Sequence, residues 1–185
     1  KKVVSTQKEK NKIYCSGPLF CPSEHREMKK ISDIFEKNGI DTYLPQRDGA
    51  EPYFLESMDS SFSAMIFVKP IIKLIHKIIF TIDVKEIVVC NYFSINLNGR
   101  YYDEGAMAEL GIAFGLGKTI FLFHNDQRNM FTHGLHPLIC IMSPFSVATA
   151  VENFPHLLDE LTKLEKISFD IDNLNQKVKK AYNWG

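Results

Sequence analysis

The sequence predicts an α/β fold, a single domain built around a flavodoxin-like, doubly wound, five-stranded parallel sheet. Short apolar runs alternate with stretches of helical periodicity along the 185 residues, which is typical of parallel sheets. That length suits one domain, and no internal repeat or low-complexity linker divides it. Such sheets bind ligands at the carboxyl ends of their strands, so the loops there are where a site is expected.

The early part of the chain predicts two strands and a helix. The mostly apolar segments at residues 12–15 and 40–44 predict the first two strands. Between them, a helix is expected from Ser23, a residue type favoured at the N-cap, to Asn38-Gly39, a typical C-terminal stop. The polar segment PQRDGAEP after the second strand predicts a loop.

The longest apolar stretch, residues 66–80, predicts a surface helix. It contains three lysines spaced by four residues, which therefore lie along one stripe of a helix. Three cations in fifteen residues exclude a membrane span. The helix is expected to open at about Pro70 and to run towards Val89, with a break around Asp83.

The second half of the chain continues the alternation. A third strand is expected over residues 92–97 and a fourth over residues 119–123, with a helix over residues 105–116 between them. The apolar run LICIM at residues 138–142 predicts the fifth strand.

Charge and cysteine content limit the partners. Lys plus Arg and Asp plus Glu both number 22, so no global field favours a nucleic acid polymer or an anionic membrane. Residues 1–11 are expected to form a basic flexible tail before a domain at residues 12–185. The opening segment lacks the apolar core of a signal peptide, and the four cysteines form no C-x-x-C pair, which favours a cytoplasmic protein with reduced thiols. The histidines and cysteines form no cluster with metal-ligand spacing, so neither a metal nor another cofactor is expected.

Glu109 is the most informative residue for chemistry. It is the only charged residue from 105 to 116, and its neighbours at helical offsets of three and four are small or apolar. A carboxylate in that setting is costly unless polar partners satisfy it, and the small neighbours leave room for a ligand. Two interpretations stay open: a peripheral glutamate near a helix end, and a nucleophile or acid in a cleft.

Other polar residues have two interpretations as well. Asp103, six residues before Glu109, suits a helix N-cap, a role that does not exclude a ligand contact. Asp83 lies among apolar residues and could be a cap, a surface charge or part of a site. Tyr14 in the first strand is a core residue unless its hydroxyl faces the ligand end. Asn129 lies in a polar loop, where most asparagines are simply loop residues.

Several segments, in this order, resemble the nucleoside 2-deoxyribosyltransferase family. They are KIYCSGPLF, YLPQRDG, the Asp83 segment, NLNGRYYDEGAMAELGIAFGLGK, and an N-x-x-x-x-G that begins at Asn129. The piece DEGAMAELG, which follows the pattern D-x-G-x-x-x-E-L-G, is the most specific of them. The similarity extends over residues 12–142.

The resemblance implies a role for each matching residue. Glu109 matches the nucleophilic glutamate of the family, and Asp103 matches the aspartate that holds the deoxyribose. Asp83 matches the aspartate that contacts the base and helps to protonate it. Tyr14 matches a tyrosine that hydrogen-bonds the nucleophile. Asn129 matches an asparagine given across a subunit interface to the 5′-hydroxyl of the sugar, which implies a homo-oligomer, a dimer or larger, with shared active sites.

The resemblance also suggests substrate contacts in two turns and leaves base preference open. Asn91 stands where many relatives carry an aspartate, and some relatives place a base-contacting glutamine slightly beyond the PQRDG turn. The expected substrate-binding residues in the turns after the first and second strands are Ser16, Gly17, Gln46, Arg47, Asp48 and Gly49.

The implied reaction is the transfer of a 2-deoxyribosyl group between nucleobases in nucleotide salvage. It would proceed through a covalent ester on Glu109 with retention of configuration, as in retaining glycosidases, and would need no cofactor. The expected partners are deoxynucleosides and free nucleobases. One alternative is an N-glycoside hydrolase acting on nucleoside 5′-monophosphates, for which Ser16 and Gly17 could bind the phosphate. Another is a non-catalytic nucleotide-binding module on the same fold.

Overall fold

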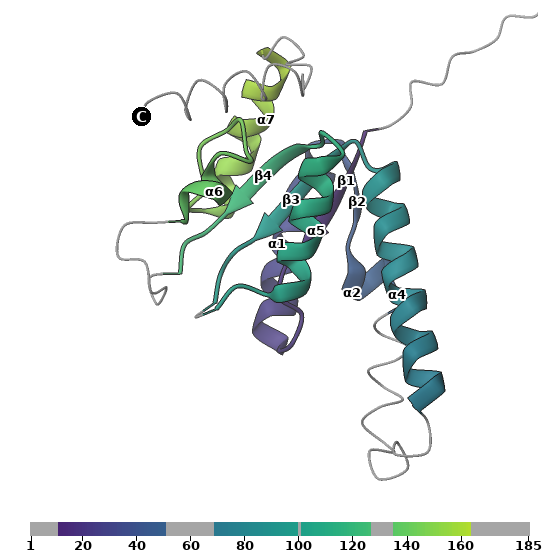
Figure 1. Ribbon diagram of the computed structural model, residues 1–185. Helices are drawn as coiled ribbons and strands as arrows, with labels where there is room; N and C mark the ends of the chain where they lie inside the picture. The colour runs from purple at the N-terminus through teal and green to yellow at the C-terminus, as the bar shows by residue number, and fades with distance from the viewer. Residues whose placement is uncertain (1–10, 51–68, 100, 127–134, 164–185) are drawn as a thin grey trace, which may run out of the picture.

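The computed structural model describes residues 11–50, 69–99, 101–126 and 135–163. A parallel sheet lies at its centre, with helices on both faces (Figure 1). The strand order is β2-β1-β3-β4, the order of the first four strands in flavodoxin-like sheets. The strands are β1 (Lys12–Ser16), β2 (Asp41–Tyr43), β3 (Tyr92–Asn96) and β4 (Thr119–Phe123). The prediction of a single α/β domain with a parallel sheet is confirmed.

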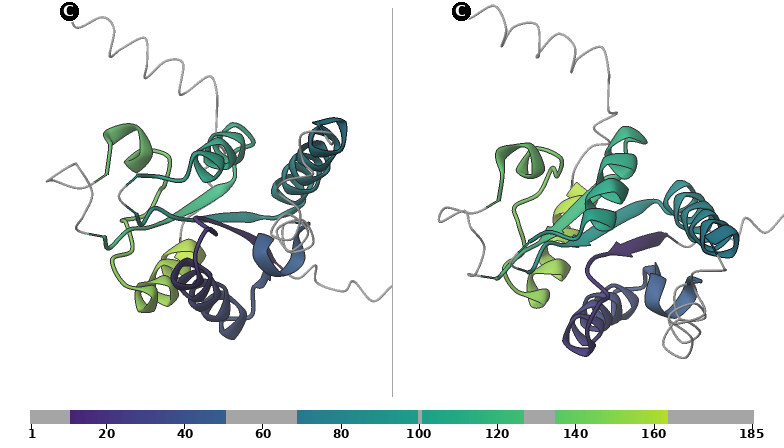
Figure 2. Two further views of the ribbon diagram at one scale, coloured as in Figure 1. Left: turned by 90° about the horizontal axis from the view of Figure 1, so that it is seen from below. Right: turned by 60° about the horizontal axis from the view of Figure 1, so that its bottom comes forward.

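Two helix pairs cover the two faces of the sheet (Figure 2). Helices α4 (Lys69–Val89) and α5 (Glu104–Gly115) lie on one face, and α1 (Pro22–Lys37) and α7 (Phe154–Lys163) lie on the other. Each face has its own buried apolar cluster.

Strand β1 contributes to both clusters, because successive side chains of a strand point to opposite faces. Ile13 and Cys15 pack in the cluster of α1 and α7, whereas Tyr14 packs in the cluster of α4 and α5. By the same alternation Ser16 shares the face of Tyr14. Two polar side chains at the end of β1 therefore face α5.

Helix α1 begins one residue before the expected cap. Pro22 occupies the first helical position, where a missing N–H costs nothing, and Cys21 rather than Ser23 is the N-cap. The carboxylate of Glu24 accepts hydrogen bonds from the backbone N–H groups of Phe20 and Cys21. The expected stop is present, since Gly39, which follows the C-cap residue Asn38, has a φ of +79°.

Helix α4 passes Asp83 without the expected break. From residue 71 to residue 89 the helix contains neither Gly nor Pro, so nothing in the backbone interrupts its hydrogen bonds. Pro70 lies in the first turn, as predicted. None of the described helices is both long enough and apolar enough to cross a bilayer.

The predicted fifth strand at residues 138–142 is wrong. Residues Pro137–Cys140 form a short helix, α6, because Pro137 starts it and the His136 side chain accepts a hydrogen bond from the Leu138 N–H. Within the described residues, the position beside β4 is taken by one parallel bridge between Phe123 and Ala148. The segment PQRDGAEP was also expected to be a loop, yet Pro45–Asp48 forms the short helix α2.

Candidate active site

The carboxylate of Glu109 is held by two hydroxyl groups from β1. Tyr14 Oη donates to Glu109 Oε1 at 2.8 Å, and Ser16 Oγ donates to Glu109 Oε2 at 2.6 Å. The two donors are two residues apart in one strand and so lie on the same face of the sheet. Each carboxylate oxygen of Glu109 therefore accepts one hydrogen bond from the strand that ends beneath it.

The environment of Tyr14 keeps its phenol protonated. Its side chain is fully buried, and its ring stacks with those of Tyr43 and Phe93 at centroid distances of 5.2 and 5.6 Å. Burial raises the pKa of Tyr14 far above its usual value, and the nearby charges of Glu109 and Asp83 raise it further. The phenol thus remains a donor to the glutamate throughout the ordinary pH range.

Glu109 and Asp83 line the same cavity, which has a volume of about 290 Å³ and lies between α4 and α5. Asp83 is only 8% exposed. The rest of the lining is mainly apolar or small. The cavity therefore combines two carboxylates with walls that suit a flat, weakly polar group. The other lining residues are His76, Ile79, Phe80, Val84, Ile87, Gly105, Ala108 and Ile112.

His76 and Phe80 line the cavity although no motif in the sequence singles them out. With Asp83 they occupy one side of α4, at spacings of seven and three residues. The sequence carries that spacing, but the lysine stripe on the same helix predicts a solvated surface instead. Phe80 is 63% exposed although it lines the cavity, so its ring presents apolar surface there.

Asp103 is the N-cap of α5. Its Oδ1 accepts a hydrogen bond from the Ala106 N–H at 2.6 Å, which fixes the start of the helix that carries Glu109. Gly105 follows in the first turn and lines the cavity. A Cβ atom on Gly105 would lie 3.3 Å from Asp103 Oδ1. A larger residue at position 105 would therefore crowd the oxygen that caps the helix.

Ser16 and Gly17 are packed within the protein. Ser16 is fully buried. A Cβ atom on Gly17 would lie 2.6 Å from Met28 Sδ and 2.9 Å from Asn96 Cβ, and the φ of Gly17 is +159°. Glycine is therefore required where the chain leaves β1 and passes between α1 and β3.

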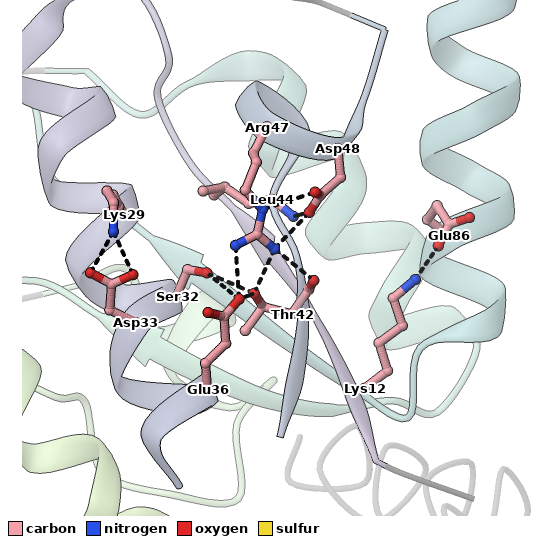
Figure 3. Close-up of polar contacts among 10 residues, drawn as sticks. All are labelled: Lys12, Lys29, Ser32, Asp33, Glu36, Thr42, Leu44, Arg47, Asp48 and Glu86. Carbon is pink, nitrogen blue, oxygen red and sulfur yellow. Dashed lines mark hydrogen bonds and ion pairs between the residues drawn. The ribbon is translucent and has the colours of Figure 1, made fainter. Parts of the chain in front are cut away.

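Arg47 and Asp48 of the PQRDG segment contact each other, α1, β2 and Leu44 (Figure 3). The Arg47 guanidinium donates to Glu36 Oε1 at 2.8 Å, to Asp48 Oδ2 at 2.8 Å and to the Thr42 carbonyl at 3.0 Å. Hydrogen bonds from Thr42 and Arg47 hold the pKa of Glu36 below its usual value. These contacts tie α2 to its neighbours in the fold.

Gln46 makes a similar contact, since its Nε2 donates to the His25 carbonyl at 2.9 Å. Among the described residues that line the cavity of Glu109 and Asp83, none comes from the segment 45–49. Asn91 also has a packing role, because its Oδ1 accepts a hydrogen bond from the Lys12 N–H at 2.9 Å and so joins β1 to the start of β3. Asn129 lies outside the described residues.

A larger cavity, of about 860 Å³, lies beside α1 at the loops that follow β3 and β4. Two of its acidic groups are already engaged, since Glu27 accepts from the amides of Asn96 and Asn98, and Asp126 accepts from the Gly99 N–H. Glu109 and Asp83 both line the smaller cavity, and neither lines this larger one. In the described part of the chain, no three His, Cys, Asp or Glu side chains are grouped to hold a metal ion.

Known proteins resemble this chain in sequence and in fold. A family model described as nucleoside 2-deoxyribosyltransferase matches residues 13–161. The crystal structure of a conserved protein from Enterococcus faecalis V583 is 19% identical, with a TM-score of 0.59 over 82% of this chain and 98% of that one. The 2-deoxyribosyltransferase from Bacillus psychrosaccharolyticus is 16% identical, with a TM-score of 0.55 over 88% and 95% of the two chains. Both structures show the same fold, while no curated protein sequence matches the chain.

Proposed function

Because the chain belongs to the nucleoside 2-deoxyribosyltransferase family, we propose that it transfers a 2-deoxyribosyl group between nucleobases through a covalent ester on Glu109. One observation carries the proposal: the Glu109 carboxylate is held at both oxygens by buried hydroxyls, at a cavity that it shares with a second carboxylate, Asp83. Displacement at the anomeric carbon needs a fixed nucleophile and a separate proton donor.

In the first step, a Glu109 oxygen attacks C1′ of the donor nucleoside. The bond from C1′ to the base nitrogen breaks, its electron pair stays on the base, and Asp83 delivers the proton that the departing base needs. In the second step, a nitrogen of the acceptor base attacks C1′, the ester bond breaks, and Glu109 is restored as a carboxylate. A proton of the acceptor returns to Asp83. Two inversions at C1′ retain the original configuration.

The side of α4 that lines the cavity offers a surface on which the base could lie. A nucleobase is planar and largely apolar on its faces, and aromatic side chains stack on such faces. Phe80 lies three residues before Asp83 on the same cavity, and His76 lies one turn further. We place the base against Phe80, with Asp83 at its edge and the sugar towards Glu109.

The remaining assignments follow the resemblance. Asp103 would hold a hydroxyl of the deoxyribose near the start of α5, and Asn129 of a neighbouring subunit would bind the 5′-hydroxyl, in a homo-oligomer that acts in nucleotide salvage. In the hydrolase alternative, Ser16 and Gly17 would bind a 5′-phosphate. The Ser16 hydroxyl is buried against Glu109, which favours the transferase.

The test is an exchange reaction. A deoxynucleoside is incubated with a different free base, and both nucleosides and both bases are followed by chromatography. We expect new nucleoside from the wild type and none from Glu109→Gln. Glu104→Gln is the matched control, since Glu104 lies in the first turn of the same helix and is exposed.

Three results would contradict the proposal in different ways. Free deoxyribose that accumulates without new nucleoside would support the hydrolase. Binding without any turnover would support the non-catalytic module. Near-normal exchange by Glu109→Gln would refute the nucleophile. Mass spectrometry of the wild type, quenched with donor alone, should find one deoxyribosyl group on the peptide that contains Glu109.

A further inference from the structure

We propose that Ser16 is a positioning residue that orients the Glu109 nucleophile, rather than a contact for the substrate. The inference rests on the proposed function for its chemical meaning, but its geometry is independent of the substrate. Ser16 Oγ lies 2.6 Å from Glu109 Oε2, and the serine is fully buried.

The two donors of β1 together fix the plane of the carboxylate. A carboxylate held by one donor can still rotate about the bond that carries it, whereas a donor on each oxygen removes that freedom. Tyr14 holds Oε1 and Ser16 holds Oε2. A carboxylate oxygen has two lone-pair sites, so a hydrogen bond from a hydroxyl does not by itself block attack by that oxygen.

The Ser16 hydroxyl is itself held in place. Ser16 pairs with Ile95 in the parallel ladder between β1 and β3. The next residue, Gly17, is packed so closely against Met28 and Asn96 that a single added carbon would clash. The end of β1 therefore cannot shift towards a ligand without disturbing both contacts.

The hydrogen bond from Ser16 changes in strength along the reaction. When a Glu109 oxygen attacks C1′, the carboxylate loses its charge and becomes an ester, whose oxygens are weaker acceptors. When the ester breaks, the charge returns and the two hydroxyls again donate to an anion. Ser16 thus stabilises the released carboxylate in the second step and orients it in the first.

The first experiment separates positioning from substrate binding. For Ser16→Ala we expect kcat to fall by about 10- to 100-fold, the range for losing a hydrogen bond to a charged group. The KM for the deoxynucleoside should stay within about threefold, in keeping with an interaction that orients the nucleophile. The Kd of the deoxynucleoside, measured by calorimetry, should be the same for Glu109→Gln and for the double variant Ser16→Ala/Glu109→Gln.

Ser94→Ala is the matched control. Ser94 is a buried serine that pairs with Cys15 in the neighbouring strand, and it points to the opposite face of the sheet from Ser16. Its kcat should stay within about twofold of the wild type. If Ser16→Ala fails to fold, Ser16→Cys fills the same position with a weaker donor, and its kcat should lie between those of the wild type and Glu109→Gln.

Two outcomes would overturn the proposal. One is a kcat of Ser16→Ala within twofold of the wild type. The other is a tenfold weaker Kd with kcat unchanged, which would make Ser16 a substrate contact. If the wild type exchanges no base at all, the proposed function fails separately. The Ser16–Glu109 contact is then tested by a double-mutant cycle of unfolding free energies, where coupling supports it and additivity refutes it.

Discussion

Replacement of Asp83 by asparagine tests whether Asp83 acts as the proton donor while Glu109 acts as the nucleophile. Asparagine has the same shape, so the nearly buried position should accept it without a change of fold. The amide can still donate a hydrogen bond to the base, but it cannot deliver a proton. The variant therefore removes proton transfer and leaves the packing of α4 in place.

The size of the effect follows from what the leaving base requires. General acid catalysis by a positioned side chain contributes about 10²- to 10⁴-fold. In the proposed mechanism Asp83 would meet the base in a cavity whose other walls are mainly apolar. For a donor whose base departs poorly as an anion, we expect kcat to fall by about 10³-fold. For a donor whose base carries an electron-withdrawing group and departs readily, the loss should be below about tenfold.

Initial rates with the two donors and one acceptor base measure this difference. Asp33→Asn on the opposite face of the protein, where Asp33 is paired with Lys29, is the control and should behave as the wild type. The proposed role of Asp83 as proton donor is refuted if transfer from both donors slows equally and only KM rises. That result would assign Asp83 to the sugar rather than to the base.

Three further predictions concern the surrounding residues. Arg47→Ala should lower the free energy of unfolding in urea by about 1–2 kcal/mol, from its half-exposed ion pairs and its bond to a backbone carbonyl, with kcat/KM unchanged; normal stability with a raised KM would instead make it a substrate residue. Phe80→Ala should raise the KM for the base by about tenfold through lost stacking, whereas Leu74→Ala, exposed on the same helix, should not; equal effects would remove the base from this wall. Mixed subunits of Glu109→Ala and Asn129→Ala should regain activity that neither variant has alone; no recovery after proven subunit exchange would refute the shared site.

The sheet was predictable because its strands carry short-range signals. Residues 120–123 are apolar and bounded by polar or turn residues, and the fourth strand, Thr119–Phe123, covers the predicted range. The run LICIM is also apolar, but it follows a proline and a capping histidine, and only Ile139 of its first four residues is buried. Local capping therefore decided the structure of that run against its apolar content.

The contacts of the polar turn after β2 could not be predicted from the sequence of the turn. The segment PQRDG gathers charge at the carboxyl end of a strand, which suggested substrate contacts. In the structure Arg47 faces Glu36 and Thr42, which come from α1 and β2 (Figure 3). The partners of a charged side chain are set by how α1 packs on the sheet, and no pattern within the turn itself reports that packing.

The lengths of the Tyr14 and Ser16 side chains explain why the Glu109 carboxylate lies where β1 ends. Alternate residues on one face of a strand are about 6.6 Å apart. The Ser16 hydroxyl is one bond from its Cβ, so a carboxylate that accepts from it must lie close to the last residue of β1. The longer Tyr14 side chain spans the distance to the same group from the previous position on that face. A long donor followed by a short one thus locates the Glu109 carboxylate at the carboxyl edge of the sheet, where the loops that would bind a nucleoside begin.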